Sequence, residues 1–263
     1  MKIEENYLEI NRQSWNNVVD VHKASDFYDM EKFRSGATSL KSIELNLLGD
    51  VKGKTILHLQ CHFGQDSLSL ARMGAQVTGI DFSDKAIDTA RNLSRELGLS
   101  ATFICCDVYS TLDHITEKFD IVYTSYGTIG WLPELNDWAK VVSSALKPGG
   151  KLIFVEFHPV VWMFDNHFKK VQYSYFNKDA IIETTDGTYT NRDAPITNQS
   201  VSWNHSLAEV LESLLRSGLT LEHVEEFDYA PYNCFEETEE YASGKYRIKD
   251  FGNKIPIVNR IME

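Results

Sequence analysis

The alternation of apolar and polar residues between positions 52 and 157 predicts a series of buried strands separated by helices and turns. The strands are expected at 56–59, 76–80, 103–107 and 119–123, with a fifth that ends near Phe157. A helical pattern follows Gly64, where Leu68, Leu70 and Ala71 are spaced to share one face. Strands that alternate with helices are typical of an α/β domain built on a parallel sheet.

The segments on either side of this region have their own patterns. Residues 1–50 contain an amphipathic stretch, an aromatic link at 27–33 and a helical pattern at 40–48. Almost fifty residues separate Phe157 from the next predicted helix, near Ser206, and such a long connection is uncommon unless it is functional or disordered.

The long connection has strand character, which predicts a small antiparallel cap. Strands are expected at 173–176 and 181–185, and Asp186-Gly187 followed by 188–190 indicates a two-residue hairpin turn. A second aromatic connection, 229–255, lies between a sixth strand at 219–227 and a last strand at 255–261.

Acidic residues end two of the predicted strands. Asp81 follows the second strand and Asp107 ends the third. In a doubly wound sheet, ligands bind beyond the carboxyl ends of the strands, where a carboxylate can accept two hydrogen bonds from a ribose diol. The pattern predicts a nucleoside cofactor.

The dinucleotide fingerprint G-x-G-x-x-G is absent, because Gln60 and His62 accompany Gly64 in the first turn, which weighs against a nicotinamide oxidoreductase.

In the order and spacing of these elements, residues 52–157 resemble the class I S-adenosylmethionine-dependent methyltransferases. The stretch LHLQCHFG at 57–64 resembles a subgroup in which this sequence replaces the usual acid-x-Gly-x-Gly-x-Gly motif. His58 stands for the acid, and Gln60 and His62 for two glycines. The resemblance implies a Rossmann-like, seven-stranded, mostly parallel sheet with helices on both faces, whose last strand is antiparallel, and an N-terminal helical lid over the cofactor cleft.

The resemblance also implies the cofactor, S-adenosyl-L-methionine, and the residues that hold it. Asp81 is expected on the ribose, Asp107 on the exocyclic amine of adenine, and Tyr28 near the carboxylate, unless Tyr28 packs under a helix instead. At the first turn, either the backbone amides or the side chains of Gln60 and His62 hold the methionine end. The full expected set is Tyr28, Gln60, Cys61, His62, Gly64, Asp81, Phe82, Ser83, Asp107, Val108 and Ser125.

The catalytic candidates follow the fourth and fifth strands. The reaction is an in-line displacement at a methyl carbon, which needs an oriented nucleophile and, for an OH, NH or SH group, can need a base. Glu156 and His158 could orient the acceptor and take its proton; alternatively, Glu156 is a partnered structural residue and His158 caps the strand. Tyr126 could contact the acceptor or the sulfonium. Trp131 is expected to pack before the next helix.

Composition restricts the partners. Twenty-six basic and thirty-eight acidic residues give a net charge of −12, which disfavours nucleic acid and favours a small-molecule substrate.

No apolar run approaches ~18 residues, and the acidic N-terminus does not resemble a signal peptide, so we expect no membrane partner and a cytoplasmic protein. The four cysteines include no C-x-x-C pair, and no histidine spacing completes a zinc set, so no metal is expected.

The sequence thus predicts one methyltransferase domain, 1–263. Within it, 1–50 form the N-terminal helical lid, 51–157 the cofactor-binding core, 158–204 the cap insertion and 205–263 the C-terminal part of the core. The expected function is methyl transfer from S-adenosylmethionine to an oxygen, nitrogen or sulfur atom of a small molecule, by a monomer or homodimer. The alternative is a regulatory protein that binds S-adenosylmethionine without transferring its methyl group.

Overall fold

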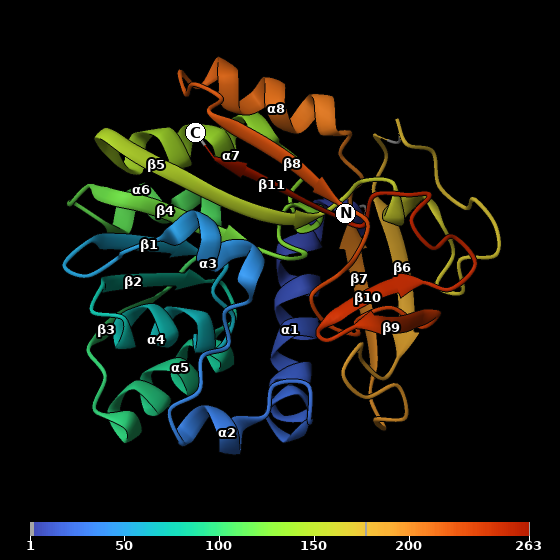
Figure 1. The fold of residues 1–263 in the computed structure, drawn as a ribbon, viewed down its shortest axis with the longest axis horizontal. Coiled ribbons are helices and arrows are strands. Elements are labelled where there is room, and N and C mark those ends of the chain that lie inside the picture. Colours follow the sequence, from blue (N-terminus) through green and yellow to red (C-terminus); the bar gives the residue numbers. More distant parts are fainter. Residues whose placement is uncertain (1–2, 177, 263) are drawn as a thin grey trace.

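A seven-stranded sheet forms the centre of the computed structural model, which describes residues 3–176 and 178–262 (Figure 1). The strand order is β3-β2-β1-β4-β5-β11-β8. The first five are parallel, and β11 pairs antiparallel with both β5 and β8, as the resemblance implied. The strands are β1 (Thr55–Leu59), β2 (Gln76–Asp81), β3 (Ala101–Cys105), β4 (Phe119–Ser125), β5 (Leu146–Phe157), β8 (His223–Phe227) and β11 (Val258–Met262).

Helices cover both faces of this sheet because neighbouring strand residues point to opposite sides. Leu57 packs with α7 and α8 on one face, whereas Ile56 packs with residues of α3 and α4 on the other. The helices are α1 (Tyr7–Ala24), α2 (Met30–Arg34), α3 (Ser42–Leu48), α4 (Gln65–Arg72), α5 (Asp84–Leu97), α6 (Thr111–His114), α7 (Leu135–Ala145) and α8 (Leu207–Arg216). Short 3₁₀ turns lie at Ile3–Asn6, Val108–Ser110, Ile129–Trp131 and Val161–Met163.

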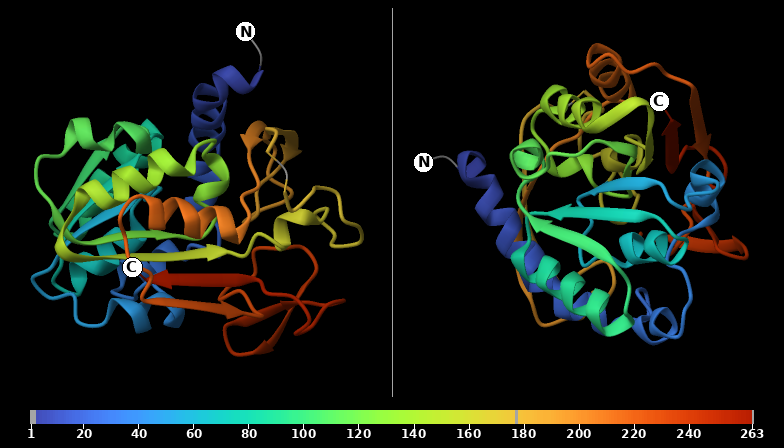
Figure 2. Two further views of the ribbon diagram at one scale, coloured as in Figure 1. Left: turned by 90° about the horizontal axis from the view of Figure 1, so that it is seen from above. Right: turned by 90° about the vertical axis from the view of Figure 1, so that its left-hand side faces the viewer.

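Helix α1 packs against α5 and against strand β7, which belongs to one of two small hairpins beside the central sheet, and its N-terminal end projects from the body of the molecule (Figure 2). The hairpins are β6 (Ile181–Asp186) with β7 (Thr197–Ser202), and β9 (Thr238–Ala242) with β10 (Lys245–Ile248). The Asn11 amide docks β7 on α1, since its Nδ2 donates to the Val201 carbonyl at 2.7 Å and its Oδ1 accepts from the Val201 amide at 2.9 Å.

The antiparallel cap is present, but two of its predicted details are wrong. β6 does not turn back at Asp186-Gly187; it pairs with β7 across a loop that spans 187–196, and 188–190 form a separate turn. The turn is held by tertiary contacts, because the Tyr189 ring lies 4.8 Å from the His22 ring on α1. The predicted strand at 173–176 is irregular, and the Phe176 side chain is exposed.

Gly64, at the start of α4, is a backbone position where a side chain should be costly. Its φ is +79°, and a Cβ there would lie 2.7 Å from a ring carbon of the buried Phe103. Gly98 has a similar φ, +62°, but a Cβ at that position would meet nothing within 4 Å. Gly98→Ala should therefore lower the free energy of unfolding by about 1–2 kcal/mol through backbone strain alone.

Gly64→Ala should cost about 1–3 kcal/mol more than Gly98→Ala, because overpacking adds to the strain. Urea unfolding of both variants beside the parent chain measures the difference. Equal losses would mean that Phe103 gives way without cost, contrary to this expectation.

Candidate active site

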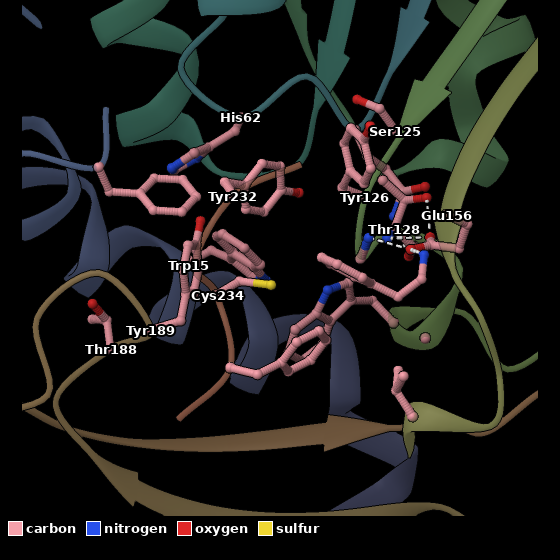
Figure 3. Close-up of a pocket in the computed structure, with 18 of the residues that line it drawn as sticks. Trp15, His62, Ser125, Tyr126, Thr128, Glu156, Thr188, Tyr189, Tyr232 and Cys234 are labelled. Atoms are coloured by element: carbon pink, nitrogen blue, oxygen red, sulfur yellow. Dashed lines mark hydrogen bonds between the residues drawn. The ribbon is translucent and has the colours of Figure 1, made fainter. Parts of the chain in front are cut away.

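A cavity of about 1160 Å³ opens at the carboxyl ends of the parallel strands and extends to the β6–β7 hairpin (Figure 3). Its walls include the loops after β1, β2, β4 and β5, the 26–29 segment after α1, and residues of β6 and β7. A smaller cavity of about 30 Å³ lies between α1 and the loop after β3. The two share wall residues Gln60, Asp81, Phe82 and Trp131, so they adjoin one another.

The turn after β1 has the left-handed backbone conformation typical of glycine, although two of its positions are not glycine. Gln60 has φ +55° and His62 has φ +49°, both in the left-handed region, followed by Gly64. This conformation costs a side-chain-bearing residue about 1–2 kcal/mol, and such strain concentrates at functional sites. Gln60 Nε2 donates to the Thr128 carbonyl at 2.8 Å, which ties the turn after β1 to the turn after β4.

Asp81 is buried in the wall shared by both cavities. Its two carboxylate oxygens accept hydrogen bonds from the backbone amides of His62, at 2.8 Å, and Ser83, at 2.9 Å. Burial raises the pKa of Asp81 to about 6, although these hydrogen bonds oppose the rise. Ser83 lines neither cavity; its hydroxyl accepts from the Ala86 amide and donates to Asn16 on α1. Ser83 therefore holds Asp81 and α1 in place.

His62 connects the first turn to α1 and the cap. Its Nε2 lies 3.0 Å from Nδ1 of His22, and burial lowers the pKa of both rings, that of His22 to about 3, so both are neutral. Tyr28 stacks on His22, and its hydroxyl lies 2.5 Å from that of Tyr189. Tyr28 thus lines the cavity and packs against the Phe63 ring, and its contact with the cofactor carboxylate stays a prediction.

The smaller cavity contains the expected adenine residues. Asp107 and Val108 line it, together with Tyr7, Leu8 and Asn11 of α1. Asp107 also caps the following turn, because its oxygens accept from the amides of Tyr109 and Ser110 and from the Ser110 hydroxyl. About 30 Å³ holds only one or two water molecules. An adenine ring therefore enters only if α1 or a neighbouring side chain shifts.

The three catalytic candidates occupy different environments. Glu156 is buried and accepts hydrogen bonds from the amides of residues 127–129 and 157 and from the Thr128 hydroxyl, so it holds the turn after β4 (Figure 3). His158 lines neither cavity; it accepts from the Val160 amide and lies 2.8 Å from Glu226. Tyr126 lines the large cavity, and its hydroxyl donates to Glu44 Oε2 at 2.8 Å.

Glu44 and Asp66 are two of the acidic residues in the cavity wall that were not selected from the sequence. Glu44, on α3, is fully buried, and burial raises its pKa to about 7, with a further contribution from Asp66. Asp66, in the first turn of α4, accepts from the Ser39 hydroxyl at 2.5 Å. The sequence feature that could have indicated Glu44 is its position on the apolar face of the predicted helix, four residues after Leu40 and next to Ile43. Trp131, expected only to pack, lies in both cavity walls.

The strand order and the cavity at the carboxyl edge define the Rossmann-like fold of the S-adenosylmethionine-dependent methyltransferases. Solved structures share it: a methyltransferase of this type from Clostridium acetobutylicum ATCC 824 aligns with a TM-score of 0.59 at 15% identity, over 95% of this chain and 98% of that one. The structure described as a DhpI-SAH complex aligns with a TM-score of 0.56 at 17% identity, over 98% and 97% of the two chains.

Sequence comparison agrees over the core. Residues 56–150 match the family model described as a methyltransferase domain. The ubiquinone biosynthesis O-methyltransferase of Coxiella burnetii (strain RSA 493 / Nine Mile phase I) is 36% identical over 115 residues, 44% of this chain and 47% of that protein. The enzyme of the same name from Proteus mirabilis (strain HI4320) is 28% identical over 135 residues, 50% and 55% of the two chains. The matches to curated relatives thus span about half of their length.

None of the helices within 3–176 and 178–262 has the length and apolarity needed to cross a membrane. In the same described part of the chain, no three His, Cys, Asp or Glu side chains gather as a metal ion would require.

Glu156→Gln tests the structural role of this carboxylate. The glutamine amide would point an N–H group at backbone N–H donors, which leaves buried donors without acceptors. The free energy of unfolding should fall by about 2–3 kcal/mol in chemical denaturation. Glu212→Gln, at an exposed position on α8, is the matched control and should change little. Unchanged stability of the Glu156 variant would contradict this structural role and favour a side chain that orients the acceptor.

Proposed function

We propose that this chain transfers a methyl group from S-adenosylmethionine to a small-molecule acceptor. The observation that carries the proposal is a buried carboxylate, Asp81, in the wall between two adjoining cavities at the carboxyl edge of a methyltransferase fold. S-adenosylmethionine supplies an activated methyl group on a sulfonium sulfur. The LHLQCHFG turn supports placing the chain in a subgroup with this form of the first motif.

The residues of the two cavities fit the parts of this cofactor. Asp107 and Val108 would contact adenine in the smaller cavity, with Phe82 on the base or ribose, and Asp81 would accept from the ribose hydroxyls. The methionine end would lie in the larger cavity. Two buried atoms there, Gln60 Oε1 and His62 Nδ1, have no hydrogen-bond partner among the described residues. Buried polar atoms are normally hydrogen-bonded, so a polar ligand would supply the missing partners.

The remaining part of the large cavity would hold the acceptor. Its walls are rich in aromatic side chains from the end of β5 and from the connections after β5 and β8, which suit a small organic molecule: Phe157, Trp162, Tyr232 and Phe235. The net charge of −12 supports a small molecule over a nucleic acid.

The N-terminal segment and the cap would act as two lids of a single domain. Helix α1 covers the smaller cavity, and Tyr189 of the cap meets Tyr28 at the wall of the larger one. Ser125, at the end of β4, would complete the cofactor site beside Asp66. We further propose a cytoplasmic monomer or homodimer.

Binding of S-adenosylhomocysteine, the demethylated cofactor, tests the proposal directly. The parent chain should bind it in isothermal titration calorimetry. Asp81→Ala should weaken binding roughly ten- to a hundredfold, because a hydrogen bond to a charged group contributes about 1.5–3 kcal/mol. Asp88→Ala, at an exposed position on α5, is the control and should bind like the parent. Absence of binding by the parent would overturn the proposed function, and unchanged affinity of the Asp81 variant would remove Asp81 from the site.

The raised pKa of Asp81 gives a pH dependence with a defined sign. Burial places this pKa at about 6, so the carboxylate gains a proton as the pH falls through that value and loses an acceptor for the ribose hydroxyls. Affinity for S-adenosylhomocysteine should therefore decline between neutral pH and about pH 5. Asp81→Asn should bind weakly at every pH with a flatter profile. Parallel profiles for parent and variant would assign the titration to another group.

A further inference from the structure

We propose that Tyr126 and Glu44 form a proton-accepting pair in the large cavity and that the methyl acceptor is the nitrogen of a small, positively charged amine. This inference rests on the proposed function and adds the substrate class and a residue, Glu44, that acts through Tyr126. Four observations carry it: the hydrogen bond between the two side chains, the fixed position of Tyr126, the charge of the cavity and its aromatic wall.

The hydrogen bond sets what Tyr126 offers to a ligand. Its hydroxyl proton is donated to Glu44 Oε2, 2.8 Å away, so toward a ligand in the cavity that Tyr126 lines, the Tyr126 oxygen can act only as an acceptor. The other Glu44 oxygen accepts from the Lys41 amide at 2.5 Å. Burial raises the pKa of Tyr126, which keeps the phenol protonated and donating to the carboxylate. The substrate atom that receives the methyl group must therefore carry a hydrogen that it can donate to the Tyr126 oxygen.

The position of Tyr126 is fixed at a cost in backbone energy. Its φ is +46°, in the left-handed region, and the next three residues are held by hydrogen bonds to Glu156. Tyr126 follows Ser125, at the end of β4, and lies on the same side of the cavity as Thr128 and Glu156, across from His62 and Tyr189 (Figure 3). Strain kept beside a cavity is typical of a side chain whose direction matters for function.

The charge of the cavity favours a cation. Ten acidic and four basic side chains line it. No Lys, Arg or His side chain in the described ranges pairs with Glu44, whereas Asp66 faces it from α4 and raises its pKa further. A buried carboxylate with an acidic neighbour is stabilised by a positively charged ligand and repels a carboxylate or phosphate.

The aromatic wall around Tyr126 fits the same ligand. Phe157 and Tyr232 lie with ring centroids 5.7 and 5.2 Å from that of Tyr126. Trp162 and Phe235 extend the wall, with ring centroids 5.6 and 5.1 Å from that of Phe157. Electron-rich ring faces attract ammonium groups with about 0.5–2 kcal/mol each, most strongly where water is excluded.

The proton transfer balances with the methyl transfer. The ammonium nitrogen gives a proton to the Tyr126 oxygen while the Tyr126 proton passes to Glu44, which becomes a neutral carboxylic acid. The freed nitrogen lone pair forms the bond to the methyl carbon, the methyl–sulfur bond breaks, and its electron pair remains on sulfur. The methylated ammonium keeps one positive charge, and Glu44 returns its proton to solvent after product release.

The test uses two probes that differ only in the charged group, phenethylamine and 2-phenylethanol. Calorimetry on the full chain saturated with S-adenosylhomocysteine, at about pH 8 where the amine is protonated and Glu44 ionised, measures both affinities. The amine should bind at least about tenfold more tightly than the alcohol. Glu44→Gln should remove this preference, and Tyr126→Phe should reduce it while leaving Glu44 in place. Glu212→Gln, which removes a charge from an exposed helix position, should retain it.

A pH profile separates a proton-accepting role from a structural one. Amine affinity of the parent should fall as the pH drops through about 7, where Glu44 gains a proton, and this fall should be absent in Glu44→Gln. The groups that face Glu44 are the Lys41 amide just before its own helix, Asp66 on α4, Tyr123 and Tyr126 in and after β4, and Tyr232 after β8. A fall that persists in the glutamine variant would assign the titration to Asp66 and overturn the role of Glu44.

The outcomes distinguish this inference from the proposed function. Failure of the parent to bind S-adenosylhomocysteine overturns the proposed function. If it binds S-adenosylhomocysteine but prefers no amine over the alcohol, or binds neither probe, the amine assignment alone is wrong. Circular dichroism checks that each variant is folded, and if Glu44→Gln does not fold, Tyr126→Phe decides the result.

Discussion

The hydrogen bonds that Asp81 accepts from the His62 and Ser83 amides are the interactions on which the rest of the site depends. They join the turn after β1 to the end of β2 and to the start of α5 through one buried carboxylate. Because Ser83 also donates to Asn16, the same carboxylate fixes the path of α1 over the smaller cavity. Burial without a cation raises the pKa of Asp81, so ionised Asp81 costs folding energy that a ribose diol can offset by donating two hydrogen bonds.

Backbone strain gathers around the same cavity. Gln60, His62 and Tyr126 all have positive φ and all line the large cavity. Each costs about 1–2 kcal/mol relative to an ordinary conformation, which a fold of marginal stability keeps only where surrounding contacts enforce it. The bond from Gln60 to the Thr128 carbonyl and the hydrogen bonds of Glu156 to the same turn are those contacts. The turns after β1 and β4 are therefore one unit, although Gln60 and Thr128 lie 68 positions apart in the chain.

The sequence was sufficient for the core because each buried strand carries its own apolar pattern, and burial on both faces leaves little freedom in register. It was not sufficient where tertiary contacts decide. Asp186-Gly187 has a local hairpin signal, yet Tyr189 packs on α1, and the chain forms a longer loop. Likewise, the sequence left open whether Glu156 orients an acceptor or is a partnered structural residue, and only the fold shows that its oxygens accept hydrogen bonds from backbone amides. Glu44 could not be selected from the sequence, because its hydrogen bond with Tyr126 depends on how α3 packs beside the turn after β4.

Helix α1 belongs to both halves of the site. Its residues Tyr7 and Leu8 cover the cavity assigned to adenine, and one helical turn later Asn11 both lines that cavity and holds Val201 by two hydrogen bonds. Val201 lies in β7, between two serines that line the large cavity, Ser200 and Ser202. A cavity of about 30 Å³ cannot admit adenine without displacing part of this cover. A shift of α1 at Asn11 is transmitted to β7, because a buried amide that loses both bonds to Val201 costs several kcal/mol. On the proposed assignment of adenine to the smaller cavity, a shift of α1 would also move the β7 wall of the large cavity, because Asn11 and Asn17 of α1 are both hydrogen-bonded to β7.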